Sequence, residues 1–140
     1  MLLKRCHILG FGKLQDFTYD FSEGFNLICT ENGWGKSTFA AFLRAMFYGL
    51  PQTTKKNLDE AERKKYKPWN GGVMGGSLVF EVNGKEYRAE RTFGKKEAED
   101  TFRLIDLSTN LDSADYSAEL GKELFGLDKE AYLVKHHFRF

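Results

Sequence analysis

The fold depends on one stretch of the chain, Thr30-Glu31-Asn32-Gly33-Trp34-Gly35-Lys36-Ser37-Thr38. The apolar run 25–29 before it is typical of a buried strand, and the apolar spacing from 39 to 50 after it predicts a helix. Strand, loop and helix in this order are the context in which the pattern G-x-x-x-x-G-K-[ST] forms a phosphate-binding P-loop. The stretch meets that pattern with one departure, because Thr30 stands where the first glycine is expected.

The motif gives most of these residues a chemical role. Backbone N–H groups of the loop and of the helix N-terminus form a concave anion site, and Gly33 and Gly35 let the backbone approach phosphates closely. Lys36 is expected to contact the β- and γ-phosphates as a catalytic residue, and Ser37 to bind Mg²⁺. The sequence therefore predicts a site for ATP and Mg²⁺ made of Thr30, Glu31, Asn32, Gly33, Trp34, Gly35, Lys36, Ser37 and Thr38.

The residue at position 30 leaves two interpretations open. A β-branched residue resists a positive φ angle, so Thr30 lowers the affinity if the loop needs that geometry and is harmless if the position is extended. The alternative interpretation of the whole stretch is an ordinary loop before a helix capped by Ser37 or Thr38.

Composition indicates a globular domain and argues against several classes of protein. The 140 residues suffice for one domain with a core, 41% of them are hydrophobic, and a formal net charge of +1 argues against a uniformly basic surface that coats nucleic acid. The N-terminus lacks the features of a signal peptide, and no apolar run approaches the length of a membrane span. We expect a cytoplasmic protein that does not enter a membrane. The two cysteines, Cys6 and Cys29, lie in strand-like runs and are expected to be buried.

Alternating apolar residues predict a pair of strands before the motif. Leu2–Phe11 and Leu14–Phe21 flank the turn signal Gly12-Lys13. After the motif, Gly49 and Pro51 are expected to end the predicted helix.

The segment Gln52–Trp69 has almost no apolar residues and is rich in lysine and arginine. We expect a surface segment, partly helical around 59–65, whose charges are more commonly solvated than bound to DNA. Trp69 precedes the glycines Gly71-Gly72, where its ring either stacks on a base or fills the core.

A β-meander is predicted next. Ser77–Val82 and Lys85–Phe93 form a hairpin around Asn83-Gly84, which supplies the two positive φ angles of a type I′ turn. The alternating run Thr101–Leu107 adds a third strand.

The C-terminal part is expected to be helical. Tyr116–Phe125 is closed by Gly126, and Asp128 caps a further helix that runs to Lys135. The adjacent pair His136-His137 would point to opposite sides of a strand and lie apart on a helix, which argues against a metal chelate.

Taken together, these features resemble the N-terminal lobe of ABC-type ATPase heads in the SMC/SbcC/RecF-like group of DNA-repair and chromosome-maintenance ATPases. The resemblance rests on Leu14–Phe21, on Glu23–Ile28 and on the particular motif form in Glu31–Thr38. The Lys67-Pro68-Trp69 segment followed by the Ser77–Phe93 hairpin is similar to bacterial SMC-like proteins of the AAA-type ATPase group. The resemblance implies an α/β P-loop NTPase fold, an ABC-ATPase-like N-terminal half-head with a mixed, partly antiparallel sheet and a β-meander.

The resemblance also implies partners. In such heads a C-terminal half beyond a coiled coil supplies the signature motif and the catalytic glutamate, and two heads enclose two ATP molecules. We therefore expect ATP hydrolysis only with a C-terminal half or a second head, in a homo- or hetero-oligomer that acts on DNA. Within a single lobe spanning 1–140, we expect a strand pair, P-loop and helix (1–50), a basic surface insert (51–72), a β-meander (73–107) and a helical tail (108–140).

Three departures from the family pattern bear on function. Thr30 replaces a glycine, Gly12-Lys13 stands where many relatives have an arginine, and the tail 134–140 lacks the glutamine that helps to hold Mg²⁺. We interpret that tail as a truncation or a shifted reading frame. The alternative function is a catalytically incomplete binding or regulatory module that associates with a partner head, or with DNA through Lys55–Lys67. A small P-loop kinase fits less well, because such kinases continue with parallel βα units.

Overall fold

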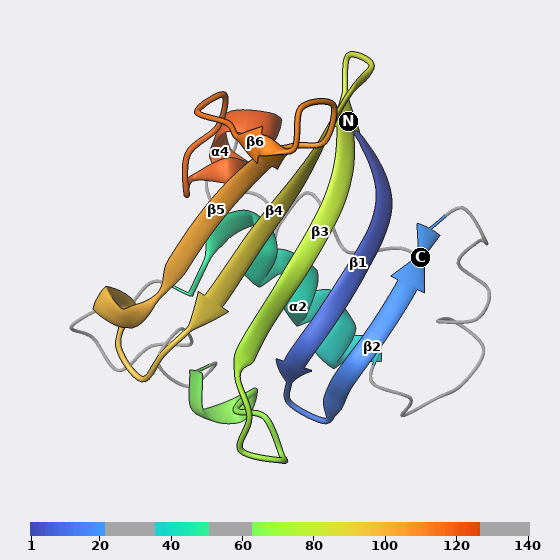
Figure 1. Cartoon of the computed structure of the whole chain (residues 1–140). Helices are drawn as coiled ribbons and strands as arrows, with labels where there is room; N and C mark the ends of the chain where they lie inside the picture. Colours follow the sequence, from blue (N-terminus) through green and yellow to red (C-terminus); the bar gives the residue numbers. More distant parts are fainter. Residues whose placement is uncertain (22–35, 51–62, 127–140) are drawn as a thin grey trace.

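A computed structural model of the chain describes residues 1–21, 36–50 and 63–126. Their architecture is one six-stranded sheet with helix α2 (Lys36–Tyr48) lying across one face (Figure 1). The strand order is β2-β1-β3-β4-β5-β6. The strands are β1 (Leu2–Phe11), β2 (Leu14–Asp20), β3 (Met74–Val82), β4 (Lys85–Phe93), β5 (Thr101–Asp106) and β6 (Leu111–Asp112).

Every pairing among the described strands is antiparallel. The predicted α/β class and the antiparallel part of the sheet are therefore confirmed. The predicted central strand Phe25–Cys29 lies outside the described residues, as do the predictions for Asp128–Lys135 and His136-His137. In the part of the chain that is described, no helix is long and apolar enough to cross a membrane.

The core lies between α2 and the sheet. The helix has its apolar residues at the predicted 3.6-residue spacing, and Phe39, Phe42 and Met46 are fully buried. Gly76 on β3 allows this close packing, because a Cβ there would meet the His7 carbonyl oxygen at 2.2 Å and the Phe42 ring at 3.0 Å. Each large side chain buried in this way contributes about 1.5–3 kcal/mol to stability.

Cys6 belongs to the same core. It is buried on β1, as predicted, and burial raises the pKa of its thiol to about 12. A thiol in this state is unreactive.

The predicted hairpin is confirmed. Strands β3 and β4 pair from Met74 opposite Phe93 to Val82 opposite Lys85. The turn residues Asn83 and Gly84 have φ angles of 51° and 80°, the left-handed values that a type I′ turn requires.

The C-terminal described region differs from the prediction in two ways. Helix α4 spans Leu120–Phe125 and does not begin at Tyr116. Ser117 explains the later start, because its backbone N–H donates to the Glu123 carboxylate at 3.0 Å and holds the chain outside the helix. The short strand β6 was not predicted, since a two-residue strand leaves no alternating pattern to detect.

Candidate nucleotide-binding site

The described part of the predicted site is the first turn of α2. Lys36 is the first helical residue, Ser37 is exposed, and Thr38 is buried. The first turn has no acidic side chain, so nothing in it offsets the positive end of the helix dipole. This end of a 13-residue helix is therefore suited to an anion such as a phosphate group.

The remaining predicted site residues, Thr30 to Gly35, lie outside the described residues, and so does the side chain of Lys36. The structure thus places Lys36, Ser37 and Thr38 together in one helical turn. Their predicted contacts with ATP and Mg²⁺ stay predictions.

The turn between β1 and β2 packs against this helix end. Gly12 has a φ angle of 59°, and a Cβ on it would lie 3.1 Å from Thr38 Cγ2 and 3.4 Å from Tyr66 Cδ1. The fold thus places the Gly12-Lys13 turn beside the first turn of α2. Glycine is favoured at this position, because the φ angle is positive and a Cβ would press on the Thr38 methyl group.

Backbone hydrogen bonds connect the same turn to the segment before β3. The Gly12 N–H donates to the Tyr66 carbonyl at 2.7 Å, and the Trp69 N–H donates to the Gly12 carbonyl at 3.1 Å. The Tyr66 ring stacks on Phe11 with 4.9 Å between ring centroids, and Lys65 Nζ lies 5.4 Å from the Tyr66 ring centroid. The end of the basic segment is therefore anchored to the corner that adjoins the first turn of α2.

The structure corrects the prediction that Gln52–Trp69 is a solvated surface segment, and it excludes one of the two alternatives for Trp69. The segment is not wholly a solvated surface, because Arg63 and Tyr66 are both buried. Trp69 is 79% exposed and does not fill the core, whereas the neighbouring Pro68 is buried. Residues 51–62 lie outside the described part.

Arg91, on β4, lies at the opposite end of α2. Its side chain is buried, and its Nε–H donates to the Met46 carbonyl at 2.8 Å. Its Nη2 also donates to the carbonyls of Phe47 and Ala118. The guanidinium carbon lies 4.6 Å from the centroid of the Phe102 ring, and burial lowers the arginine pKa to about 10.

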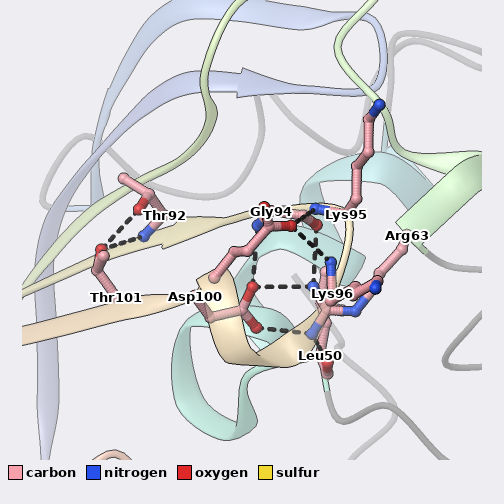
Figure 2. Close-up of polar contacts among 9 residues, drawn as sticks. Leu50, Arg63, Thr92, Gly94, Lys95, Lys96, Asp100 and Thr101 are labelled. Carbon is pink, nitrogen blue, oxygen red and sulfur yellow. Dashed lines mark hydrogen bonds and ion pairs between the residues drawn. The ribbon is translucent and has the colours of Figure 1, made fainter.

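Arg63 is the second buried arginine at this end of the helix (Figure 2). Its two terminal nitrogens donate to the two oxygens of Asp100 at 2.9 and 2.6 Å, and Nη1 also donates to the Gly94 carbonyl at 3.1 Å. Nη2 donates to the Leu50 carbonyl as well. Asp100 in turn accepts a hydrogen bond from the Gly94 N–H at 2.9 Å. Arg63 thus ties the residues just past α2 to the loop between β4 and β5.

Sequence reasoning missed both arginines. Arg91 lies on the same inward face of β4 as Tyr87 and Ala89. This alternation in the sequence could have indicated a buried charge. A second signal is the lack of a basic residue in the last turn of α2, where a helix favours a cation. Among the described residues, no three His, Cys, Asp or Glu side chains are grouped so that they could hold a metal ion.

Comparison with known families matches residues 5–138 to the AAA domain. The chain belongs to this family. Its AAA domain is 32% identical over 137 residues to the uncharacterized protein YhaN of Bacillus subtilis, an alignment that covers 88% of this chain. It is also 36% identical over 93 residues, 65% of this chain, to the DNA double-strand break repair Rad50 ATPase of Archaeoglobus fulgidus. The Rad50 ATPase of Sulfolobus acidocaldarius is 27% identical over 131 residues, 91% of this chain.

These relatives confirm the resemblance to the SMC/SbcC/RecF-like group. The chain covers only a small share of their length, 13% of YhaN and 10% and 14% of the two Rad50 ATPases.

Proposed function

We propose that this chain is the ATP- and Mg²⁺-binding N-terminal part of an SMC/SbcC-like ATPase that acts in DNA repair or chromosome maintenance. The observation that carries the proposal is the first turn of α2. It presents an exposed Ser37 beside Lys36, contains no acidic side chain, and is held by Thr38 against the β1–β2 turn. The similarity to Rad50 ATPases supports the nucleotide, and it supports DNA repair as the setting.

In this proposal each residue of the motif has its own role in binding ATP and Mg²⁺. The backbone N–H groups of Thr30, Glu31, Asn32, Gly33, Trp34 and Gly35, together with the start of α2, surround the phosphates. Lys36 contacts the β- and γ-phosphates, Ser37 gives its hydroxyl to Mg²⁺, and Thr38 fixes the helix end in place. Bound Mg²⁺ neutralises charge that develops on the phosphate oxygens.

Hydrolysis needs groups that the motif does not supply. A general base and the signature loop are proposed to come from a C-terminal half or from a second head, which makes the working unit a homo- or hetero-oligomer. We propose that 1–140 forms a single lobe in that assembly and that the assembly is cytoplasmic.

A second candidate function is a binding or regulatory module that associates with a partner head or with DNA without needing the nucleotide. Thr30 favours it, because a β-branched residue at the first motif position lowers affinity wherever the loop requires a positive φ angle. Under this alternative, Lys36→Ala leaves the association with a partner head unchanged.

Equilibrium binding of a fluorescent ATP analogue, measured with and without Mg²⁺, tests the proposal. We expect Lys36→Ala to weaken binding in both conditions by about tenfold or more, since a lost charged hydrogen bond costs about 1.5–3 kcal/mol. Ser37→Ala should remove only the enhancement by Mg²⁺. Lys122→Ala, on the exposed side of α4, is the matched control and should bind like the parent. Equal binding by the parent and Lys36→Ala would refute the proposed site.

A further inference from the structure

A pocket of about 560 Å³ lies where β3 begins and β4 ends, beside the segment that precedes β3. We call it the basic pocket. Its lining includes Arg63, Lys64, Lys67, Val73, Lys95 and Glu99. None of these residues belongs to the predicted nucleotide site.

The lining of the basic pocket carries three exposed lysines. Lys64, Lys67 and Lys95 are exposed, and among the described residues their side chains form no ion pair. Arg63 does not add to this charge, because Asp100 neutralises it. Glu99 is the one acidic residue of the lining, and its carboxylate accepts hydrogen bonds from the backbone N–H groups of Lys95 and Lys96 at 3.0 and 3.1 Å.

The basic pocket also offers apolar surface. Val73 is 59% exposed, whereas Met74 and Phe93, which also line the pocket, are buried. The lining therefore combines one exposed apolar side chain with three exposed lysines, which suits a ligand that carries both apolar and acidic groups.

We propose that the basic pocket docks an acidic segment of a partner protein, with carboxylates meeting Lys64, Lys67 and Lys95 and an apolar side chain covering Val73. Charge complementarity selects an acidic partner. The exposed Val73 favours a peptide over a single-stranded nucleic acid, because it offers an aliphatic contact, whereas the aromatic residue of the lining, Phe93, is buried and presents no face on which a base could stack. Glu99 on the rim also repels a phosphate backbone, whereas a peptide can place a neutral residue opposite it.

Fluorescence anisotropy with a labelled peptide of alternating glutamate and leucine tests the proposal at about 0.15 M salt, where long-range attraction is screened. The same peptide with glutamine in place of glutamate is the neutral probe. A single-stranded oligonucleotide of equal net charge is the competing class of ligand. The proteins are the parent chain, the double variant Lys67→Glu/Lys95→Glu, Val73→Ser, and Lys122→Glu as a charge-matched control outside the pocket.

The expected result is binding of the acidic peptide that weakens at least about tenfold in the double variant. Binding should weaken a few-fold in Val73→Ser and stay unchanged in Lys122→Glu. Because Lys67 and Lys95 are exposed, the double variant should melt like the parent, and a Lys67→Gln/Lys95→Gln pair carries the test if it does not.

Three results would overturn the proposal. One is equal binding of the glutamine peptide, another is an equal loss in Lys122→Glu, and the third is tighter binding of the oligonucleotide than of the acidic peptide. None of these results depends on ATP, so failure here leaves the proposed nucleotide site untouched.

Discussion

The two ends of helix α2 differ in the side chains that surround their terminal backbone groups. At the C-terminal end, the buried Arg91 and Arg63 donate to the carbonyls of Met46, Phe47 and Leu50. At the N-terminal end, the first turn has an exposed Ser37 and no acidic side chain. A helix leaves unsatisfied carbonyls at one end and unsatisfied N–H groups at the other. Here protein groups satisfy the carbonyls, and we propose that a ligand satisfies the N–H groups.

The difference has a physical lesson. Both arginines come from segments distant from α2 in sequence, so the C-terminal end is fixed by tertiary structure and serves stability. The N-terminal end is positioned by the packing of Gly12 on Thr38 and by the buried Phe39 ring, and neither contact adds a charge to the first turn. Substitutions at the two ends should therefore affect different properties.

The largest effect is expected from Arg91→Met. The variant leaves the carbonyls of Met46, Phe47 and Ala118 without this donor, and unsatisfied buried groups cost about 1–3 kcal/mol each. We expect a loss of about 3 kcal/mol or more in the free energy of unfolding, measured by urea denaturation. Arg103→Met is the control, because that side chain is 57% exposed and its removal should cost far less than that of Arg91. Equal losses for the two variants would contradict a structural role for Arg91.

The next effect concerns the pair Arg63 and Asp100. Asp100→Asn keeps the shape but leaves a buried guanidinium without its counter-ion, and we expect a loss of about 2 kcal/mol. A double-mutant cycle with Arg63→Met should give a coupling energy above about 1 kcal/mol. The corresponding cycle for the exposed pair Arg103 and Asp112 should give a much smaller coupling energy. Similar coupling in the two cycles would mean that burial of the first pair has no energetic consequence.

At the other end of α2, Gly12→Ala should cost about 1–2 kcal/mol, because alanine resists a positive φ angle. Gly71→Ala has the same conformational strain, but its Cβ would meet no atom within 4 Å. The contact with Thr38 is therefore what separates the two variants. We expect Gly12→Ala alone to weaken binding of an ATP analogue, by several-fold in a fluorescence titration. Equal affinities for both variants would show that the β1–β2 turn does not position the site.

The smallest effect lies far from both ends of α2. Hydrogen bonds from Ser108, with help from Lys85, lower the pKa of Asp106, and hydrogen bonds from Tyr87 and Lys85 lower that of Asp115. A carboxylate whose pKa is lower in the folded state stabilises the fold above its unfolded pKa of about 4, and that contribution is lost as the pH falls further. Asp106→Asn should therefore lower the melting temperature at pH 7 by less than about 3 °C and match the parent near pH 2. A deficit that persists at that acid pH would assign the effect to packing.

Local patterns in the sequence predicted much of the fold. The hairpin followed from Asn83-Gly84, and α2 followed from its apolar spacing and from Gly49, whose φ angle of 72° ends the helix. These features depend on residues close together in the chain. Such a local pattern can be recognised in the sequence without knowing which distant residues it contacts in the fold.

Long-range contacts were not predictable in the same way. Arg91 reaches a carbonyl 45 positions away and Arg63 one that is 13 away, and neither acceptor has a side-chain signature. A charged residue in a basic run is usually solvated, which is why Arg63 was expected at the surface. Strand β3 likewise pairs directly with β1, although α2 lies between the two strands in the sequence, and no local pattern indicates this pairing. The first turn of α2 was predicted because its motif is local, whereas the contact of Gly12 with Thr38 was not.

The melting temperature of the chain, with and without Mg²⁺ and a non-hydrolysable ATP analogue, tests the central claim most directly. A ligand that binds only the folded state at about 100 times its Kd adds about 2.7 kcal/mol, a rise of roughly 5–10 °C for a domain of this size. We predict this rise in the parent and in Lys122→Ala, and a rise of about half that size or less in Lys36→Ala, since binding that is tenfold weaker loses about half of the stabilisation. A parent that unfolds cooperatively at the same temperature with and without the nucleotide would contradict the account.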